Sequence, residues 1–88
     1  MQNDQAKTLL TKAVHEAVDR YFSKVDDYEL ADLYGLVTGE VEKILLCYVW
    51  QYTQGNKSRM SRILGLSRVT LSKKLEKVAG FLDDQYNR

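Results

Sequence analysis

The 88-residue sequence contains no proline, and its five glycines stand at positions 35, 39, 55, 65 and 80. Proline interrupts helices and glycine commonly ends them, so a chain with this pattern can form long helices separated by glycine turns. Apolar residues recur at spacings of three and four, as one face of a helix requires. The sequence predicts an all-α fold with four helices, at about 6–24, 29–53, 57–64 and 68–78.

The predicted helix 29–53 is apolar over a wider arc than one neighbouring helix can cover. The chain is short enough to form a single domain, spanning 1–88, that buries only about 60 to 65% of the surface of the unfolded chain. We therefore expect a homodimer in which the helices within 6–54 form a four-helix bundle. A monomer with a large central helix is the alternative. The residues expected at the dimer interface are Leu33, Leu36, Val37, Val41, Ile44, Leu45 and Tyr48.

Two glycines, Gly35 and Gly39, lie inside this predicted helix, where each costs roughly 1 kcal/mol relative to alanine. Either they allow another backbone to approach closely, as small residues do at tight helix crossings, or they are incidental weak points. The sequence leaves both interpretations open.

The formal net charge of +1 conceals an uneven distribution. Residues 1–54 carry five Lys or Arg against nine Asp or Glu, whereas residues 55–79 carry seven against one, so a polyanion is expected to approach the second segment. No stretch of eighteen apolar residues is present, and the first residues do not have the order of a signal peptide. A cytoplasmic protein without membrane contact is therefore expected. The single cysteine, Cys47, fits a reducing compartment and a packing role.

The basic segment 55–79 has the punctuation of a helix-turn-helix. Gly55 is predicted to end the long helix, Asn56 to cap the third helix and Ser67 to cap the fourth, with Gly65 in the turn between them. The side chains expected to face the core are Met60, Ile63, Leu64, Leu66, Leu71 and Leu75, with the small Ser61 where the two helices cross. Those expected to face outward, forming a basic surface, are Arg68, Val69, Thr70, Ser72, Lys73, Lys74 and Lys77.

This outward face suits double-stranded DNA. Arg68 lies in the first turn of the helix 68–78, the part that enters the major groove, and its guanidinium can bind guanine O6 and N7. Thr70 is expected to contact a phosphate or a base. Lysine ammonium groups bind phosphate without reading sequence, which is the role expected of Lys73, Lys74 and Lys77. The start of the third helix adds a phosphate site formed by Asn56, Ser58 and Arg59.

Catalysis is not expected from these residues. His15 has no Cys, Ser or Asp at a convincing spacing, and the sequence contains neither a phosphate loop nor a metal-ligand cluster. We therefore expect no enzyme activity, no cofactor and no metal, and interpret His15 as a surface residue. The alternatives to DNA binding are a solvated basic surface and a helical adaptor that binds another protein through the apolar face of helix 29–53.

The run DLYGLVTGEVEKILLCYVWQYTQGNKSRMSRILGLSRVTLSKKLEKVAG, together with AVHEAVDRYF upstream, resembles the family of the factor for inversion stimulation, Fis. The segment QYTQGN followed by SR.TL.KKL is its most specific part. The resemblance implies a bacterial nucleoid-associated homodimer that regulates transcription, with RNA polymerase as a further candidate partner. It also implies recognition helices too close together for straight DNA, which must therefore bend. The DNA contacts that it implies are Asn56, Ser58, Arg59, Arg68, Thr70, Lys73 and Lys74.

The sequence departs from the family pattern at several positions. Ser67 replaces an asparagine, Ser72 an arginine and Glu76 a lysine, and we expect these changes to weaken phosphate binding or alter sequence preference. Many members carry a proline near Ile44, and its absence predicts a straighter helix here. No paired-strand pattern precedes the first helix, so contact with recombinases and stimulation of DNA inversion are not expected. The tail 80–88 has no assigned role.

Overall fold

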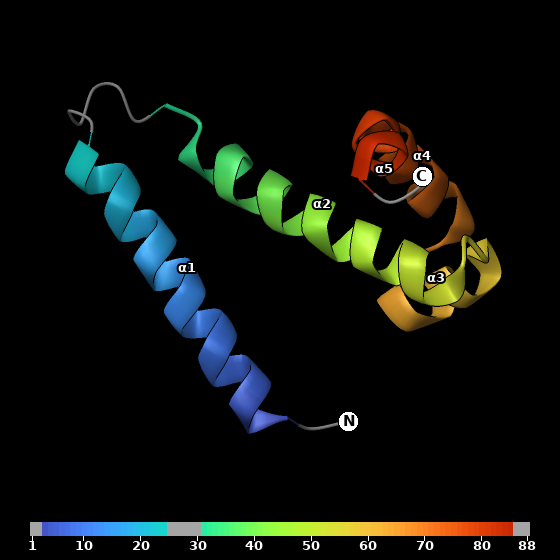
Figure 1. Cartoon of the computed structure of the whole chain (residues 1–88), viewed down its shortest axis with the longest axis horizontal. Helices are drawn as coiled ribbons and strands as arrows, with labels where there is room; N and C mark the ends of the chain where they lie inside the picture. Colours follow the sequence, from blue (N-terminus) through green and yellow to red (C-terminus); the bar gives the residue numbers. More distant parts are fainter. Residues whose placement is uncertain (1–2, 25–30, 86–88) are drawn as a thin grey trace. The chain divides into compact units, whose positions relative to one another are not determined.

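The computed structural model describes residues 3–24 and 31–85, and within these ranges the chain is helical without any strand (Figure 1). The predicted all-α fold is confirmed, but the predicted number of four helices is wrong because a fifth lies in the tail. The chain divides into two compact units, Met1–Val37 and Thr38–Arg88. The helices are α1 (Asp4–Lys24), α2 (Leu33–Thr53), α3 (Lys57–Leu64), α4 (Arg68–Lys77) and α5 (Ala79–Gln85).

Helix α1 begins two residues earlier than predicted because Asn3 caps it. The side-chain oxygen of Asn3 accepts a hydrogen bond from the Ala6 N–H at 2.9 Å, and its backbone carbonyl accepts one from the Lys7 N–H at 3.1 Å. These bonds satisfy donors that the first turn of a helix otherwise leaves unpaired. The large apolar side chains Leu9 and Leu10 of this helix are exposed.

Helix α2 begins at Leu33, later than the predicted start at 29. Residues 29 and 30 lie outside the described part of the chain, while Ala31 and Asp32 are not helical. Asp32 has a φ of 61° and its carbonyl accepts the Leu36 N–H at 3.1 Å, which places it at the N-cap position. Aspartate tolerates this left-handed conformation better than most residues.

The two glycines of α2 have different surroundings. A Cβ at Gly35 would stand only 2.7 Å from a carboxylate oxygen of Asp32, so the glycine makes room for the side chain of the N-cap residue. A Cβ at Gly39 would meet no atom of the described chain within 4 Å. Gly35 thus accommodates the side chain of Asp32, whereas the close approach of another backbone at Gly39 stays a prediction.

A tight turn joins α2 to α3, as predicted from Gly55. Gln54 and Gly55 both have positive φ, at 55° and 80°, and the Gly55 N–H donates to the carbonyl of Trp50 at 2.9 Å. A side chain at Gly55 would also meet the Trp50 ring at 3.2 Å. Glycine is therefore favoured at this position both by its backbone conformation and by the indole packed against it.

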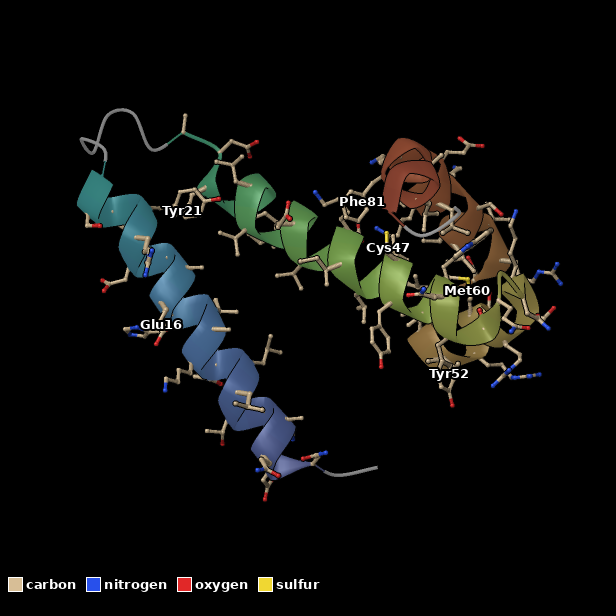
Figure 2. All side chains as sticks on the ribbon, viewed as in Figure 1. Glu16, Tyr21, Cys47, Tyr52, Met60 and Phe81 are labelled. Carbon is tan, nitrogen blue, oxygen red and sulfur yellow. The ribbon has the colours of Figure 1, made fainter. Side chains whose placement is uncertain are left out.

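The hydrophobic core lies in the unit Thr38–Arg88 and joins four helices. Its buried side chains are Leu46, Cys47 and Val49 from α2, Met60 from α3, Leu71 and Leu75 from α4, and Leu82 from α5. Figure 2 shows Cys47 and Met60 between α2 and the C-terminal helices. Burial raises the pKa of the Cys47 thiol, against the opposing effect of Lys43, so the predicted packing role of this cysteine is confirmed.

Two further features complete the fold. The predicted inward position of Ile63 is wrong, because this side chain is 50% exposed while Met60 of the same helix is fully buried. Phe81 of α5 lies against α2, with the ammonium of Lys43 4.5 Å from the centre of its ring. Among the residues that the structure describes, no helix combines the length and apolar character needed to cross a lipid bilayer.

Candidate nucleic-acid interface

Helices α3 and α4 form a helix-turn-helix whose ends are fixed by the predicted caps. The Asn56 side-chain oxygen accepts the Arg59 N–H at 3.1 Å, and the Ser67 hydroxyl accepts the Thr70 N–H at 3.1 Å. Gly65 is the C-cap of α3 and adopts a left-handed conformation with φ of 73°. Its N–H donates to the carbonyl of Ser61 at 2.9 Å. Both helices therefore begin and end where the sequence predicted, except that α4 ends at Lys77 rather than at 78.

The hydroxyls of Ser67 and Thr70 act as a pair. The Ser67 hydroxyl donates to the Thr70 oxygen at 3.0 Å while accepting the Thr70 backbone N–H. The Ser67 side chain is thus committed to the helix cap, and the exposed Thr70 hydroxyl lies beside it at the start of α4.

Most of the predicted site residues share one property, which is that they are exposed. This holds for Asn56, Ser58, Arg59, Arg68, Thr70, Lys73 and Lys77. Ser72 is instead half-buried, so its predicted outward position is wrong. It lines a hollow beside Trp50 and Lys57, near the start of α3.

Lys74 differs from the other lysines of α4 because it already has an anionic partner. Its ammonium lies 2.6 Å from Oε2 of Glu42 on α2, and the Lys74 side chain is 31% exposed. Within the described residues, no carboxylate lies within ion-pair distance of Arg68, Lys73 or Lys77. The four cations of α4 are therefore not equivalent.

Arg59 is held by an aromatic neighbour that the sequence did not suggest. Its guanidinium lies 5.6 Å from the centre of the Tyr52 ring, at the end of α2. Tyr52, labelled in Figure 2, is 64% exposed, and Arg59 is itself an exposed residue. A cation held over an aromatic face loses less freedom when it binds an anion.

Two further cations were not among the predicted site residues. Lys57 and Arg62 are exposed on α3, and Arg62 lies four residues after Ser58 and three after Arg59. Residues at these spacings are neighbours on one helix face. The position of Arg62 on this face could be predicted from the sequence. The pairing of Lys74 with Glu42 of α2 could not, because the two residues are thirty-two positions apart and no local pattern connects them.

The predicted dimer residues follow the apolar side of α2. Leu36, Val41, Ile44, Leu45 and Tyr48 are exposed, the last by 68%, whereas Leu33 and Val37 are half-buried. In the second half of α2, the buried Leu46, Cys47 and Val49 face the core instead. The same helix therefore carries one apolar side inside the core and another open to solvent.

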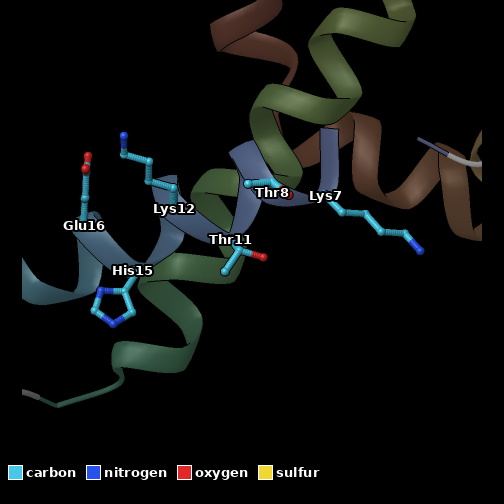
Figure 3. A pocket seen from close by; sticks show the side chains of 6 residues that line it. All are labelled: Lys7, Thr8, Thr11, Lys12, His15 and Glu16. Carbon is cyan, nitrogen blue, oxygen red and sulfur yellow. The ribbon is translucent and has the colours of Figure 1, made fainter. Parts of the chain in front are cut away.

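The hollows beside α1 do not form a site. The one in Figure 3 is lined by six residues of this helix, among them the exposed His15 and Glu16, and their side chains point in different directions. In the described part of the chain, no three His, Cys, Asp or Glu side chains are grouped to hold a metal ion.

Comparison with known proteins identifies relatives over most of the chain. The family described as "Bacterial regulatory protein, Fis family" matches residues 39–77. The "DNA-binding protein Fis" of Yersinia enterocolitica and that of Proteus mirabilis are each 41% identical over 76 residues, which is 86% of this chain and 78% of theirs. That of Pectobacterium carotovorum is 42% identical over 78 residues, 85% of this chain and 80% of its own. No solved structure matches the chain.

These matches confirm the predicted resemblance, which rested on the run from Asp32 to Gly80 together with the segment 13–22 upstream. The relatives are named as DNA-binding proteins and not as enzymes, in agreement with the prediction that the chain is not an enzyme. With such identity over more than three quarters of each relative, the chain belongs to the Fis family of bacterial regulatory proteins.

Proposed function

We propose that the protein is a homodimer that binds and bends double-stranded DNA, organising the nucleoid and regulating transcription in the cytoplasm. The observation that carries this proposal is the basic outward surface of α3 and α4. Its cations other than the half-buried Lys74 are exposed, while Met60, Leu71 and Leu75 fix the same helices in the core. A rigid element with free cations can meet phosphates without reorganising, and the relatives are named for DNA binding.

Each side chain then has a role that follows from its chemistry. Arg68 opens α4 and reads guanine in the major groove through its planar guanidinium. Lys73 and Lys77 follow on the exposed side and bind phosphates as point charges. Arg59, held by Tyr52, binds a phosphate near the start of α3.

The remaining polar groups lie near these cations. Asn56 and Ser58 stand at the start of α3, where the positive end of the helix favours an anion. The exposed Thr70 hydroxyl contacts a phosphate or a base. Within the described residues, the neighbouring cations Arg59, Arg68, Lys73 and Lys77 carry no ion pair, so DNA meets no carboxylate competitor at them.

Dimer formation is supported by the exposed apolar side of α2. The exposed members are large, and a small domain seldom leaves several such side chains open along a single helix. Pairing of two copies through this side would cover them and give the four-helix arrangement that we propose for the N-terminal helices. A dimer presents two recognition helices to one duplex, and the bend accommodates their spacing.

The salt dependence of DNA binding tests the proposal. If Arg59, Lys73 and Lys77 of both protomers bind phosphates, the plot of log affinity against log salt should have a slope of about −5. Affinity should then fall by about 10³-fold between 50 and 200 mM salt. Fluorescence anisotropy with a labelled duplex measures this, and a flat titration would contradict the proposal.

Two variants separate the proposed roles of the cations. Arg68→Ala should reduce the preference among sequences selected from random duplexes, whereas Lys73→Ala should weaken binding to all of them alike. Equal uniform losses in both variants would contradict the assignment of Arg68 as the base reader.

The proposed assembly is tested separately. Sedimentation equilibrium should give a dimer, and gel mobility of permuted duplexes should reveal a bend. A stable monomer that ignores duplex DNA would instead favour an adaptor that uses the exposed apolar side of α2.

A further inference from the structure

The ion pair between Lys74 and Glu42 joins the recognition helix to α2. The ammonium lies 2.6 Å from the carboxylate, and the two side chains are 31% and 41% exposed. The pair links residues thirty-two positions apart and is the only contact of its kind between α2 and α4 within the described residues. Its cation belongs to the row of α4 lysines expected to bind phosphates.

The pair is not needed to hold α4 in place. Leu71 and Leu75, three residues before and one residue after Lys74 in the same helix, are buried and already anchor it in the core. A partly exposed ion pair is screened by solvent and adds little to stability. Stabilisation of the fold therefore does not fully explain why Glu42 faces Lys74.

The chemistry of the pair indicates a different role. An ammonium that is already neutralised by a carboxylate gains less from a DNA phosphate, and the carboxylate itself repels the phosphate that approaches. We propose that Glu42 is an internal competitor of DNA for Lys74. This inference rests on the proposed DNA binding and assigns Glu42 as a residue that determines its strength.

The competition has a defined signature. Phosphate contacts carry no sequence information, so Glu42 lowers affinity for every duplex by the same factor. It also removes the contribution of Lys74 to the salt dependence. In the wild-type complex Lys74 then acts as less than a full phosphate anchor, unlike Lys73 and Lys77.

The test compares Glu42→Gln with a matched control, Glu40→Gln. Both remove one negative charge from α2, but Glu40 pairs with Lys43 of its own helix and not with α4. Anisotropy titrations with specific and random duplexes are made over a range of salt concentrations. Glu42→Gln should tighten binding to both duplexes by about two- to five-fold per protomer and steepen the salt slope by about 0.9 per protomer. Glu40→Gln should give a smaller gain.

Lys74→Ala supplies the second measurement, in both backgrounds. It should cost less than about two-fold in the wild type but should abolish the gain in the Glu42→Gln protein, which shows the two residues to be coupled. If Glu42→Gln lost its fold, as judged by circular dichroism, the small cost of Lys74→Ala in the wild type would still support the proposal, and a ten-fold cost would overturn it.

Other results would overturn the proposal directly. These are a Glu42→Gln protein that binds no tighter than Glu40→Gln, or a Lys74→Ala cost that is the same in both backgrounds. Such results, with wild-type binding intact, leave the proposed function standing. A wild-type protein that fails to bind duplex at low salt overturns both.

Discussion

Truncation of Leu71 tests how the recognition helix is held. This side chain is fully buried between α2, α3 and α4, with Met60 and Leu75 in the same core cluster. Removing three carbons from such a site costs about 2 to 5 kcal/mol, since the cavity closes only partly. A domain of this size has a free energy of unfolding of only about 4 to 13 kcal/mol in total. Leu71→Ala should therefore remove a large fraction of the stability.

The matched control is Val69→Ala, two residues earlier in the same helix. Val69 is 68% exposed, and alanine has the higher helix propensity, so the free energy of unfolding should change by less than about 0.5 kcal/mol. For Leu71→Ala, a loss of about 3 kcal/mol lowers the thermal midpoint by about 12 to 24 °C.

Circular dichroism at 222 nm would follow both variants. The protein concentration must be equal in all samples, because the midpoint of a dimer depends on it. If the two variants melted within a few degrees of each other, the burial of α4 against the core would be refuted.

Three further predictions concern local features. Gly65→Ala should lower the free energy of unfolding, measured in urea, by about 1 to 2 kcal/mol because the backbone there is left-handed. Gly55→Ala should cost more, because a Cβ at that position also meets the Trp50 indole ring at 3.2 Å. Equal costs for the two variants would contradict this explanation. Ser67→Ala should lose about 0.5 to 2 kcal/mol and speed amide exchange in the first turn of α4, with the exchange of α1 as the unaffected reference. Burial raises the pKa of the Cys47 thiol in the folded protein above its value in the unfolded chain. The folded state therefore favours the neutral thiol, and its contribution to the free energy of unfolding is complete below the unfolded pKa and is lost as the pH rises through the folded pKa. The native protein should thus react with a thiol reagent at pH 8 far more slowly than the unfolded protein, and equal rates would contradict the burial.

The parts of the fold that could be predicted from the sequence depend on local chemistry. Asn56, Gly65 and Ser67 are recognisable because capping and left-handed turns use few residue types, and the bonds involved span only three or four residues. The exposed cations of α3 and α4 follow from the same helical spacing. The helix-turn-helix and most of its candidate DNA contacts were therefore accessible before any coordinates.

The errors arise where contacts between distant segments decide the outcome. Ile63 satisfies the apolar period of α3, yet it stays half-exposed and outside the core cluster that contains Met60 of the same helix. Glu42 meets Lys74 only through the packing of α2 on α4, which periodicity does not encode. Helix α5 was missed because its large apolar side chains are a single pair, Phe81 and Leu82, following a glycine.

Helix α5 determines where the folded unit ends. The segment 39–77 that matches the family description ends at residue 77, yet the core continues to Leu82, which is almost fully buried. A fragment trimmed at the boundary of similarity would expose apolar side chains that the longer chain keeps from water, and such surfaces promote aggregation. Leu82 therefore belongs to the same core as the helix-turn-helix, and any fragment prepared for study has to retain α5.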